Sequence, residues 1–512
     1  MSAIPPQQLA ALSDLVGRWT GLHFPRERYP ELERGLVRAS KDFGHGSTAA
    51  FVNFCLATPS LSADQVQTLA WHLTIGETYF LRGSQTFGVL EREVLPEFLL
   101  ARKNGERQLR IWSAGCAGGE EPYSLAITVS RLVPDLADWN ITILATDINT
   151  RALQKASEGV YSNWSFRDTP DWLRPHFFAK TSSGDWAIRP EIKRRVAFSY
   201  LNLAADPYPS LATNTNAMDI IFCRNVLMYF NADTMRRVVG RLHDALREGG
   251  CLFVAPSEAS HEFFPQFERM TSQGEIYYRK NGAGASHGQH GHAGARRAAP
   301  GVRARPAAGA PPAAGVASST GSAAGAQPAT ADAKRTPSYR PAKAAPEPDK
   351  PAVRPAPHAK PAHREVAAKN EEAAASAVTP AMLAAAARRA ANEGRLSEAL
   401  DDCEQAIVAD KLSADYRYLQ ATILSELDRE DDAVKALNST LYLNPRFVLA
   451  HFLYGNIARR RARAAEAGSH FRTTLSLLEE LSPDEVLPES EGMTAGKLAE
   501  IVKSILQLEA AP

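Results

Sequence analysis

Apolar residues in the first 82 positions recur with the spacing of an α-helix. Leu9, Leu12, Val16 and Trp19 fall three or four residues apart, which places them on one helical face. Similar spacing returns around residues 32–37, 51–56 and 66–73. Residues 1–82 are therefore predicted to form an all-α N-terminal domain. Its second helical segment carries basic residues that suit either a solvated face or a docking surface for an acidic helical partner: Arg26, Arg28, Arg34, Arg38 and Lys41.

Short apolar runs alternate with helical patterns from residue 108 to about residue 280. Strands are predicted at 109–113, 141–147, 196–201, 218–223 and 251–255, and helices from residue 120, over 151–157 and over 235–246. Gly249 and Gly250 are expected to stop the last of these helices. The alternation implies a doubly wound, mostly parallel sheet with helices on both faces, so 83–281 is predicted to be an α/β domain.

Aromatic residues crowd a segment that does not fit this alternation. Between residues 160 and 197 they surround a Ser-Ser-Gly-Asp turn at 182–185, which is typical of a hairpin. We interpret this segment as a small inserted β-subdomain rather than a crossover helix.

The composition changes sharply after residue 281. Residues 282–378 are rich in Ala, Pro, Gly, Ser and Arg, with Tyr339 as the single aromatic, and such a segment cannot bury enough apolar surface to fold. It is expected to be a disordered linker. Its positive charge suits a solvated tether, and contact with an acidic partner is the alternative.

A repeat of 34 residues follows the linker. Small residues recur at this period in two columns, Ala387, Ala421 and Gly455, and Ala399, Ala433 and Ala467. The pattern resembles tetratricopeptide repeats (TPRs), so residues 379–512 are predicted to form three repeats and a capping helix at 492–508. Such arrays bind peptides or other proteins on a concave surface, and a purely stabilising appendage is the alternative.

Composition and charge exclude several classes of protein. The chain has 512 residues, 58 Lys and Arg against 57 Asp and Glu, and 44% hydrophobic residues, which argues against a wholly disordered or uniformly basic protein. Five scattered cysteines without a CxxC pattern indicate reduced thiols rather than a disulfide framework, and no metal site is predicted. There is neither a long apolar run nor a recognisable secretion signal, so a cytoplasmic location without membrane insertion is expected.

Candidate chemistry lies where the first two predicted strands end. The first strand leads into Gly115, Gly118 and Gly119, a loop that suits either a ligand approaching the backbone or an ordinary tight turn. Asp147 follows about 30 residues later, where it could accept hydrogen bonds from ribose hydroxyls or cap the next helix. The Glu120–Glu121 pair would repel a pyrophosphate and suits the ammonium of S-adenosylmethionine, which favours that cofactor over NAD.

Four motifs then carry a family resemblance. Residues 112–124 (WSAGCAGGEEPYS), 145–148 (ATDI), 221–226 (IFCRNV) with Tyr229-Phe230, and 76–82 (GETYFLR) resemble, in order and spacing, the CheR chemotaxis methyltransferases. The resemblance covers about residues 10–280. The repeats that follow resemble the WspC-like branch of the family, in which TPRs come after the catalytic domain.

The resemblance implies a class I S-adenosylmethionine-dependent methyltransferase that esterifies glutamate side chains on the cytoplasmic helices of chemoreceptors and releases S-adenosylhomocysteine. Tyr229 and Arg82 are expected at the methyl-transfer site. Two positions depart from the family: Gly76 stands where Asn is common, and Pro256 replaces the His of a His-Ser-Glu sequence. The residues expected to contact the cofactor are Gly76, Thr78, Arg82, Glu120, Asp147, Asn202, Leu203, Arg224 and Asn225.

The same resemblance implies partners and leaves alternatives. A chemoreceptor cytoplasmic domain and a further protein or peptide at the TPRs are the expected partners, without nucleic acid, since Cys223-Arg-Asn225 stands where DNA amino-methyltransferases carry their signature. Some family members grip a receptor tether with the β-subdomain, and the aromatic residues here suit that role or the subdomain's own core. The open alternatives are a methyltransferase for another substrate and a signalling scaffold that binds the cofactor without turnover.

Overall fold

The computed structural model describes residues 4–102, 107–133, 135–281 and 379–510. The described residues before 282 and those from 379 onward belong to one compact unit. The expected linker at 282–378 lies outside the described residues.

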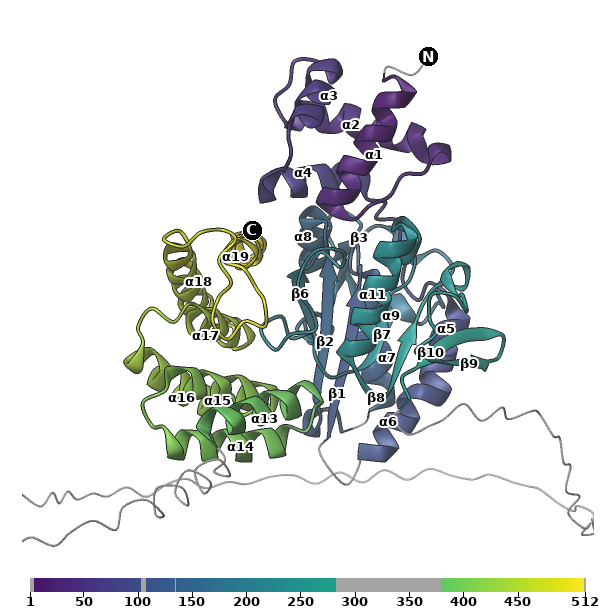
Figure 1. The fold of residues 1–512 in the computed structure, drawn as a ribbon. Coiled ribbons are helices and arrows are strands. Elements are labelled where there is room, and N and C mark those ends of the chain that lie inside the picture. The colour runs from purple at the N-terminus through teal and green to yellow at the C-terminus, as the bar shows by residue number, and fades with distance from the viewer. Residues whose placement is uncertain (1–3, 103–106, 134, 282–378, 511–512) are drawn as a thin grey trace, which may run out of the picture. The chain divides into compact units, whose positions relative to one another are not determined.

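The N-terminal part is helical (Figure 1, purple). Leu12, Val16, Leu32, Leu36 and Phe51 are buried together and form its core. Ser47 and Ser62 cap the third and fourth helices, and Ser62 forms a capping box with Gln65, so the local sequence fixes where each helix begins. The elements are α1 (Pro6–Thr20), η1 (Arg26–Arg28), α2 (Tyr29–Asp42), α3 (Thr48–Ala57) and α4 (Ala63–Leu73).

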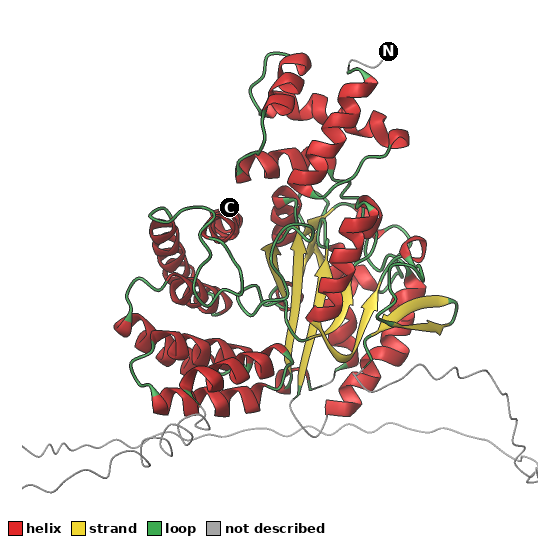
Figure 2. Cartoon of the chain, in the orientation of Figure 1, coloured by secondary structure: helices red, strands yellow, loops and turns green. Residues whose placement is uncertain are grey.

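The middle part is built on a seven-stranded sheet of order β6-β2-β1-β7-β8-β10-β9 (Figure 2, yellow). The five strands from β6 to β8 are parallel. Strand β10 pairs antiparallel with β8 and with β9, and β9 forms that edge of the sheet. Ala114 is in register with Thr146, so β1 and β2 end at the same edge of the sheet. The strands are β1 (Gln108–Ala114), β2 (Asn140–Asp147), β6 (Val196–Tyr200), β7 (Met218–Phe222), β8 (Leu246–Phe253), β9 (Glu268–Ser272) and β10 (Glu275–Arg279).

Helices cover the sheet, and its side chains alternate between two cores. Ile111 belongs to one buried cluster and its neighbour Trp112 to the other, as expected for successive residues of a strand. The predicted doubly wound fold is therefore confirmed. The covering elements are α5 (Ser84–Val89), the π-helical turn η2 (Leu90–Val94), α6 (Leu95–Arg102), α7 (Glu120–Leu132), η3 (Leu136–Asp138), α8 (Thr150–Glu158), η5 (Leu227–Tyr229), α11 (Ala232–Ala245) and η6 (Pro256–Glu258).

Two features of the sheet differ from the sequence prediction. The expected glycine stop was wrong, because α11 already ends at Ala245 and both Gly249 and Gly250 lie inside β8. Gly249 has a φ of 77° and donates its N–H to the Lys280 carbonyl at 2.8 Å, so it turns the backbone where β8 meets the edge hairpin. The β9–β10 hairpin was not predicted, because β9 (Glu-Arg-Met-Thr-Ser) is largely exposed and has no apolar run.

The inserted segment forms a second, three-stranded antiparallel sheet of order β3-β5-β4. Phe80, Tyr161, Phe166 and Phe178 pack their rings 4.8–4.9 Å apart beneath it. The aromatic crowding therefore serves, at least in part, as the core of this lobe. Its elements are β3 (Val160–Tyr161), η4 (Asn163–Phe166), α9 (Leu173–Phe177), β4 (Phe178–Lys180), β5 (Trp186–Ile188) and α10 (Pro190–Lys193).

The C-terminal part is an array of helix pairs (Figure 1, green to yellow). Ala387, Ala421 and Gly455 are buried in the first helix of successive pairs, and a Cβ added at Gly455 would meet the Phe471 ring at 2.6 Å. Small residues at this period thus let paired helices cross closely. The helices are α13 (Pro380–Asn392), α14 (Leu396–Ala409), α15 (Ala414–Glu426), α16 (Glu430–Leu443), α17 (Val448–Arg460), α18 (Ala464–Leu478) and α19 (Ala495–Ala510).

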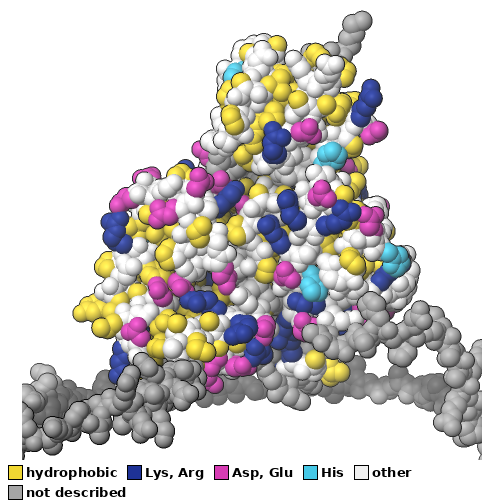
Figure 3. Space-filling view, in the orientation of Figure 1, with side chains coloured by type: hydrophobic (Ala, Val, Ile, Leu, Met, Phe, Trp, Pro, Cys, Tyr) yellow, Lys and Arg dark blue, Asp and Glu magenta, His cyan; other side chains and the backbone are white. Residues whose placement is uncertain are grey.

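Surface chemistry is mixed on the face drawn in Figure 3, where acidic and basic side chains are interspersed. In the described ranges, none of the helices has the length and apolar character needed to cross a membrane.

Candidate functional site

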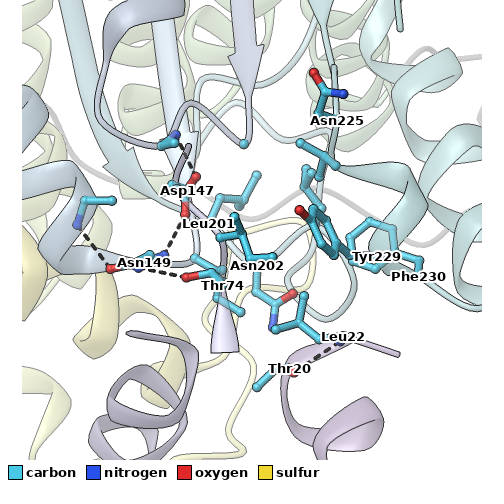
Figure 4. A pocket seen from close by; sticks show the side chains of 18 residues that line it. Thr20, Leu22, Thr74, Asp147, Asn149, Leu201, Asn202, Asn225, Tyr229 and Phe230 are labelled. Carbon is cyan, nitrogen blue, oxygen red and sulfur yellow. Dashed lines mark hydrogen bonds between the residues drawn. The ribbon is translucent and has the colours of Figure 1, made fainter. Parts of the chain in front are cut away.

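A pocket lies at the carboxyl ends of the parallel strands. Its walls come from the loops after β1, β2, β6 and β7, and from the N-terminal helical part through Thr20 and Leu22 (Figure 4). Doubly wound sheets bind their ligands at this edge. Of the residues expected at the site, the pocket is lined by Gly76, Asp147, Asn202, Leu203, Asn225 and Tyr229.

Asp147 ends β2 and is held by backbone amides. One carboxylate oxygen accepts the Ala117 N–H at 2.8 Å, and the other accepts the Asn149 N–H at 2.8 Å. Burial raises the pKa of Asp147, and these amides oppose the shift because they favour the ionised form. The carboxylate joins the glycine-rich loop to the second strand, lines the pocket, and has capacity to accept further hydrogen bonds.

The alternative interpretation of Asp147, as the cap of the next helix, does not hold for α8. The side chain that caps α8 is that of Asn149, which accepts the Ala152 N–H at 3.1 Å. The Asn149 side-chain amide then donates to Thr74 at 2.8 Å, which connects the loop after β2 to the segment that follows α4.

Glu120 begins α7 behind the glycine-rich loop and is only 2% exposed. Its Oε1 accepts a hydrogen bond from Ser165 at 2.9 Å, whereas Oε2 is buried without a hydrogen-bond partner among the described residues. A Cβ added at Gly118 would lie 2.6 Å from that oxygen, so a side chain at this position would displace the Glu120 carboxylate. A buried carboxylate oxygen with a spare lone pair suits an ammonium group.

The Glu258 side chain stabilises the loop after β7 by accepting hydrogen bonds from its backbone. Its two carboxylate oxygens accept the N–H groups of Ala255, Asn225 and Val226 at 2.8–2.9 Å and that of Met228 at 3.3 Å. Asn225 has a φ of 59°, a left-handed conformation that Asn tolerates better than most residues. Glu258 therefore fixes the turn that carries Asn225 and Tyr229, a role that the sequence did not reveal.

Comparison with known proteins agrees with this geometry. Residues 76–276 match the family model described as "CheR methyltransferase, SAM binding domain". The chain is 38% identical over 212 residues to "Chemotaxis protein methyltransferase 1" of Pseudomonas aeruginosa, covering 40% of this chain and 74% of that one. The chain belongs to the CheR methyltransferase family. It is thus a methyltransferase that uses S-adenosylmethionine.

Two further likenesses are to a second methyltransferase sequence and to a solved structure. It is 35% identical over 202 residues to "Probable biofilm formation methyltransferase WspC" of Pseudomonas aeruginosa, covering 39% of this chain and 45% of that one. Among solved structures, magnesium protoporphyrin IX methyltransferase from Synechocystis with bound cofactor has a TM-score of 0.22 and 11% identity, covering 41% of this chain and 87% of that one.

Tyr229 lies where the N-terminal part of this CheR protein meets the catalytic part. Its carbonyl accepts the His23 N–H at 2.7 Å, and the Arg28 guanidinium lies over its ring at 4.9 Å from the centroid. Burial raises the pKa of the Tyr229 hydroxyl, and Arg28 and Arg82 oppose the shift. The phenol therefore stays protonated near neutral pH and can donate a hydrogen bond.

Four expected site residues lie outside the pocket lining: Thr78, Arg82, Glu120 and Arg224. Arg82 donates to the Glu77 carbonyl at 2.9 Å, and the Thr78 carbonyl accepts from Arg167 at 3.5 Å. Arg224 is 9% exposed, donates to the Arg82 carbonyl at 2.6 Å and pairs with Glu121 at 3.4 Å. Arg224 thus braces the segment around Arg82 from inside the protein.

Glu121 is a buried brace as well. It accepts a hydrogen bond from Ser113 at 2.8 Å, and burial raises its pKa while Arg224 lowers it. Of the two neighbouring glutamates, Glu120 is the one with an unsatisfied oxygen.

Several pocket residues were not predicted from the sequence. Thr20, Leu22, Thr74, Ile75, Ile148 and Phe230 all line it, in addition to Asn149. Leu22 and Thr20 belong to the N-terminal part, and nothing in a helical pattern indicates that its end reaches a site more than a hundred residues away. Asn149 could have been found, because it follows Asp147 by two positions.

The chain's residues fit the cofactor of the family. The unsatisfied Glu120 oxygen suits the ammonium of the methionine moiety, and Asp147 suits the ribose hydroxyls. Across the described positions, no group of three or more His, Cys, Asp or Glu side chains is arranged to hold a metal ion.

Proposed function

We propose that this protein methylates glutamate side chains on the cytoplasmic domain of a methyl-accepting chemoreceptor, forming glutamyl methyl esters. The observation that carries the proposal is that Asp147 and Tyr229 line the same pocket, and that the Arg28 guanidinium lies over the Tyr229 ring. In this proposal Asp147 belongs to the cofactor side of the pocket, and Tyr229 with Arg28 to the substrate side. The chemotaxis methyltransferases to which the chain is similar support the substrate class.

The proposal gives each residue either a cofactor-binding or a substrate-contacting role. Glu120 would hold the amino group of the cofactor and Asp147 its ribose, with Gly76, Asn202, Leu203 and Asn225 forming the remaining walls. Thr78 and Arg224 lie outside the pocket lining and would support the cofactor site indirectly, by holding the segment around Arg82 in place. Arg82 and Tyr229 would meet the substrate, and the raised pKa of Tyr229 keeps a hydroxyl donor available.

The proposed chemistry needs little acid–base help. S-adenosylmethionine supplies a methyl group on a positively charged sulfur. A glutamate carboxylate is already ionised near neutral pH, so no general base is required to activate it. The residues of the pocket mainly align the carboxylate and exclude water, and the arginines attract the carboxylate by charge.

The test uses the full chain, labelled S-adenosylmethionine and a receptor cytoplasmic fragment. We expect label on the receptor as a base-labile ester that is released as methanol. Asp147→Ala should abolish transfer by removing the ribose acceptor, while Glu158→Gln, an exposed position on α8, is the matched control and should retain it.

The other outcomes separate the alternatives. Label that appears only on small molecules or nucleic acid would refute the receptor as substrate and leave a methyltransferase of another specificity. Unimpaired signalling by a variant that binds no cofactor would instead support a scaffold without turnover.

The remaining assignments belong to the same proposal. Residues 1–82 would form the receptor-facing helical domain, 83–281 the catalytic domain with its β-subdomain at about 160–197, and 379–512 a TPR domain that binds a further protein or peptide. The segment 282–378 would connect them, and the protein would work in the cytoplasm, beside the receptor helices.

A further inference from the structure

The last helix of the repeat region, α19, lies against the methyltransferase part. It contacts β6 and α8 of the catalytic part and α4 of the N-terminal helical part, all within the same compact unit. Ile501 and Ile505 are buried and line one cavity together with Leu144 of β2 and Phe198 of β6. Helix α19 therefore packs against the edge strand β6 of the sheet.

One charged residue of α19 reaches a buried carboxylate. The Lys497 ammonium lies 3.1 Å from Asp206 Oδ1 and 3.3 Å from Glu500 Oε2. Asp206 is 2% exposed, and its Oδ1 accepts no well-directed hydrogen bond from the described residues, so Lys497 acts on it mainly through charge. An ionised carboxylate at this depth is costly without a nearby cation.

Asp206 in turn holds the loop that forms one wall of the pocket. Its Oδ2 accepts the Asn202 N–H at 2.6 Å, and its own N–H donates to the Asn202 carbonyl at 2.9 Å. The Asp206 carbonyl accepts from Arg241 at 3.0 Å. Asn202 lines the pocket, as do Leu201 and Leu203 on either side of it.

A second set of polar contacts fixes where the repeats meet the sheet. The Glu426 carbonyl, at the end of α15, accepts from Gln108 and from Asn140, each at 3.0 Å. Its carboxylate accepts from Asn216 at 3.3 Å and lies 3.9 Å from the Arg110 guanidinium. These directed polar contacts specify one arrangement of the repeats on the sheet, and the second carboxylate oxygen of Glu426 is buried without a hydrogen-bond partner among the described residues.

We propose that Lys497 is a positioning residue for the cofactor pocket: from the repeat region it neutralises Asp206, which fixes the Asn202 loop. The inference rests on the assignment of this pocket to S-adenosylmethionine under the proposed function. It makes the repeat region a support of the catalytic site in addition to a surface for partners. Because coupling between sites is reciprocal, cofactor binding strengthens the seating of α19 by the same factor by which α19 strengthens cofactor binding.

The test measures cofactor binding in the full chain by titration calorimetry, without any receptor. Lys497→Met keeps the length of the side chain and removes its charge, and we expect it to raise the Kd for S-adenosylmethionine at least about fivefold, the lower end of the coupling usual between linked sites. Lys497→Arg should stay within about twofold of wild type, because it restores the cation. Lys503→Met is the matched control, an exposed lysine on the same helix, and should leave the Kd unchanged.

Hydrogen exchange supplies a second readout that a general loss of stability would not reproduce. In Lys497→Met we expect faster exchange confined to 201–206 and to α19, with the strands of the sheet protected as in wild type. An unchanged Kd together with unchanged exchange in 201–206 would overturn the proposal. Because no methyl acceptor is present, a wrong receptor assignment would leave this result untouched, and a chain that binds no S-adenosylmethionine at all would refute the pocket assignment instead.

Discussion

Two opposite effects act on the pKa of the Asp147 carboxylate. It is buried, which favours the protonated form, and it accepts amide hydrogen bonds, which favour the ionised form. Burial dominates, so its pKa lies above the ordinary value. A carboxylate with a raised pKa becomes protonated, and so loses its capacity to accept hydroxyl hydrogen bonds, at a higher pH than an ordinary carboxylate does.

This balance predicts how cofactor binding depends on pH. Ribose hydroxyls are best accepted by the ionised form, so affinity for S-adenosylmethionine should fall as pH falls, starting above the range expected for an ordinary carboxyl of pKa 3.8. Asp147→Asn should weaken binding about 10- to 100-fold, the worth of hydrogen bonds to a charged acceptor, and should flatten the pH dependence. Calorimetric titrations between pH 5 and pH 8, at about half-unit steps, would measure both; a variant with the wild-type slope would contradict the assignment.

Tyr229 gives a prediction for catalysis rather than for binding. The raised pKa keeps its phenol protonated, so activity should not decline through Tyr229 ionisation below about pH 10, its unperturbed value. Tyr229→Phe should lower kcat about three- to tenfold, the worth of one neutral hydrogen bond, with the cofactor Kd unchanged. Steady-state rates and calorimetry on the same preparation test this. A raised Kd with normal kcat would show that the hydroxyl serves the cofactor instead.

At the scale of elements, the short turn η6 stabilises a longer loop. Glu258 is 5% exposed and accepts four backbone N–H groups, three of them from the loop that follows β7. Without this carboxylate those donors would be buried and unpaired. The stability of the loop therefore depends on one side chain from a neighbouring segment.

Glu258→Ala is accordingly expected to lower the free energy of unfolding by about 2–4 kcal/mol, since several buried donors lose their acceptor together. Glu268→Ala, at an exposed position of β9, should change it by less than about 0.5 kcal/mol. Denaturant titrations of both variants measure the difference. A Glu258→Ala protein as stable as the control would mean that water replaces the carboxylate.

Some elements of the fold could be predicted from the sequence and others could not. Apolar alternation and a 34-residue period are local patterns, so the parallel strands and the helix pairs were predictable. The β9–β10 hairpin was not, because its outer strand faces solvent and carries Glu268 and Arg269 where an apolar residue would mark it. At the site, Asp147 ends one predicted strand and Asn202 follows another, and both line the pocket. The approach of Thr20 and Leu22 to the pocket depends on tertiary packing, which no local pattern encodes.

At the scale of the whole molecule, the hydrophobic core continues from one part to the next. A single buried cluster contains residues of the sheet, such as Ile143 and Phe198, and residues of the repeats, such as Ile423 and Ile501. Parts that share a core lose stability together when either is disrupted.

We therefore expect calorimetry to give one unfolding transition for the catalytic and repeat regions. Saturating S-adenosylmethionine should shift that whole transition upward, because it binds only the folded state; at about 100 times its Kd the gain is about 2.7 kcal/mol. Two separate transitions, with only one of them responsive to the cofactor, would show that the regions fold independently.

The two edges of the main sheet are protected in different ways, and this bears on the behaviour of the protein at high concentration. The edge strand β9 exposes charged side chains, which discourage a second molecule from pairing with it. The opposite edge strand, β6 (Val-Ala-Phe-Ser-Tyr), carries no charge and is contacted by α19. Helix α19 thus covers side chains of an uncharged edge strand, and its loss would expose apolar surface at that edge, where association between molecules is favoured.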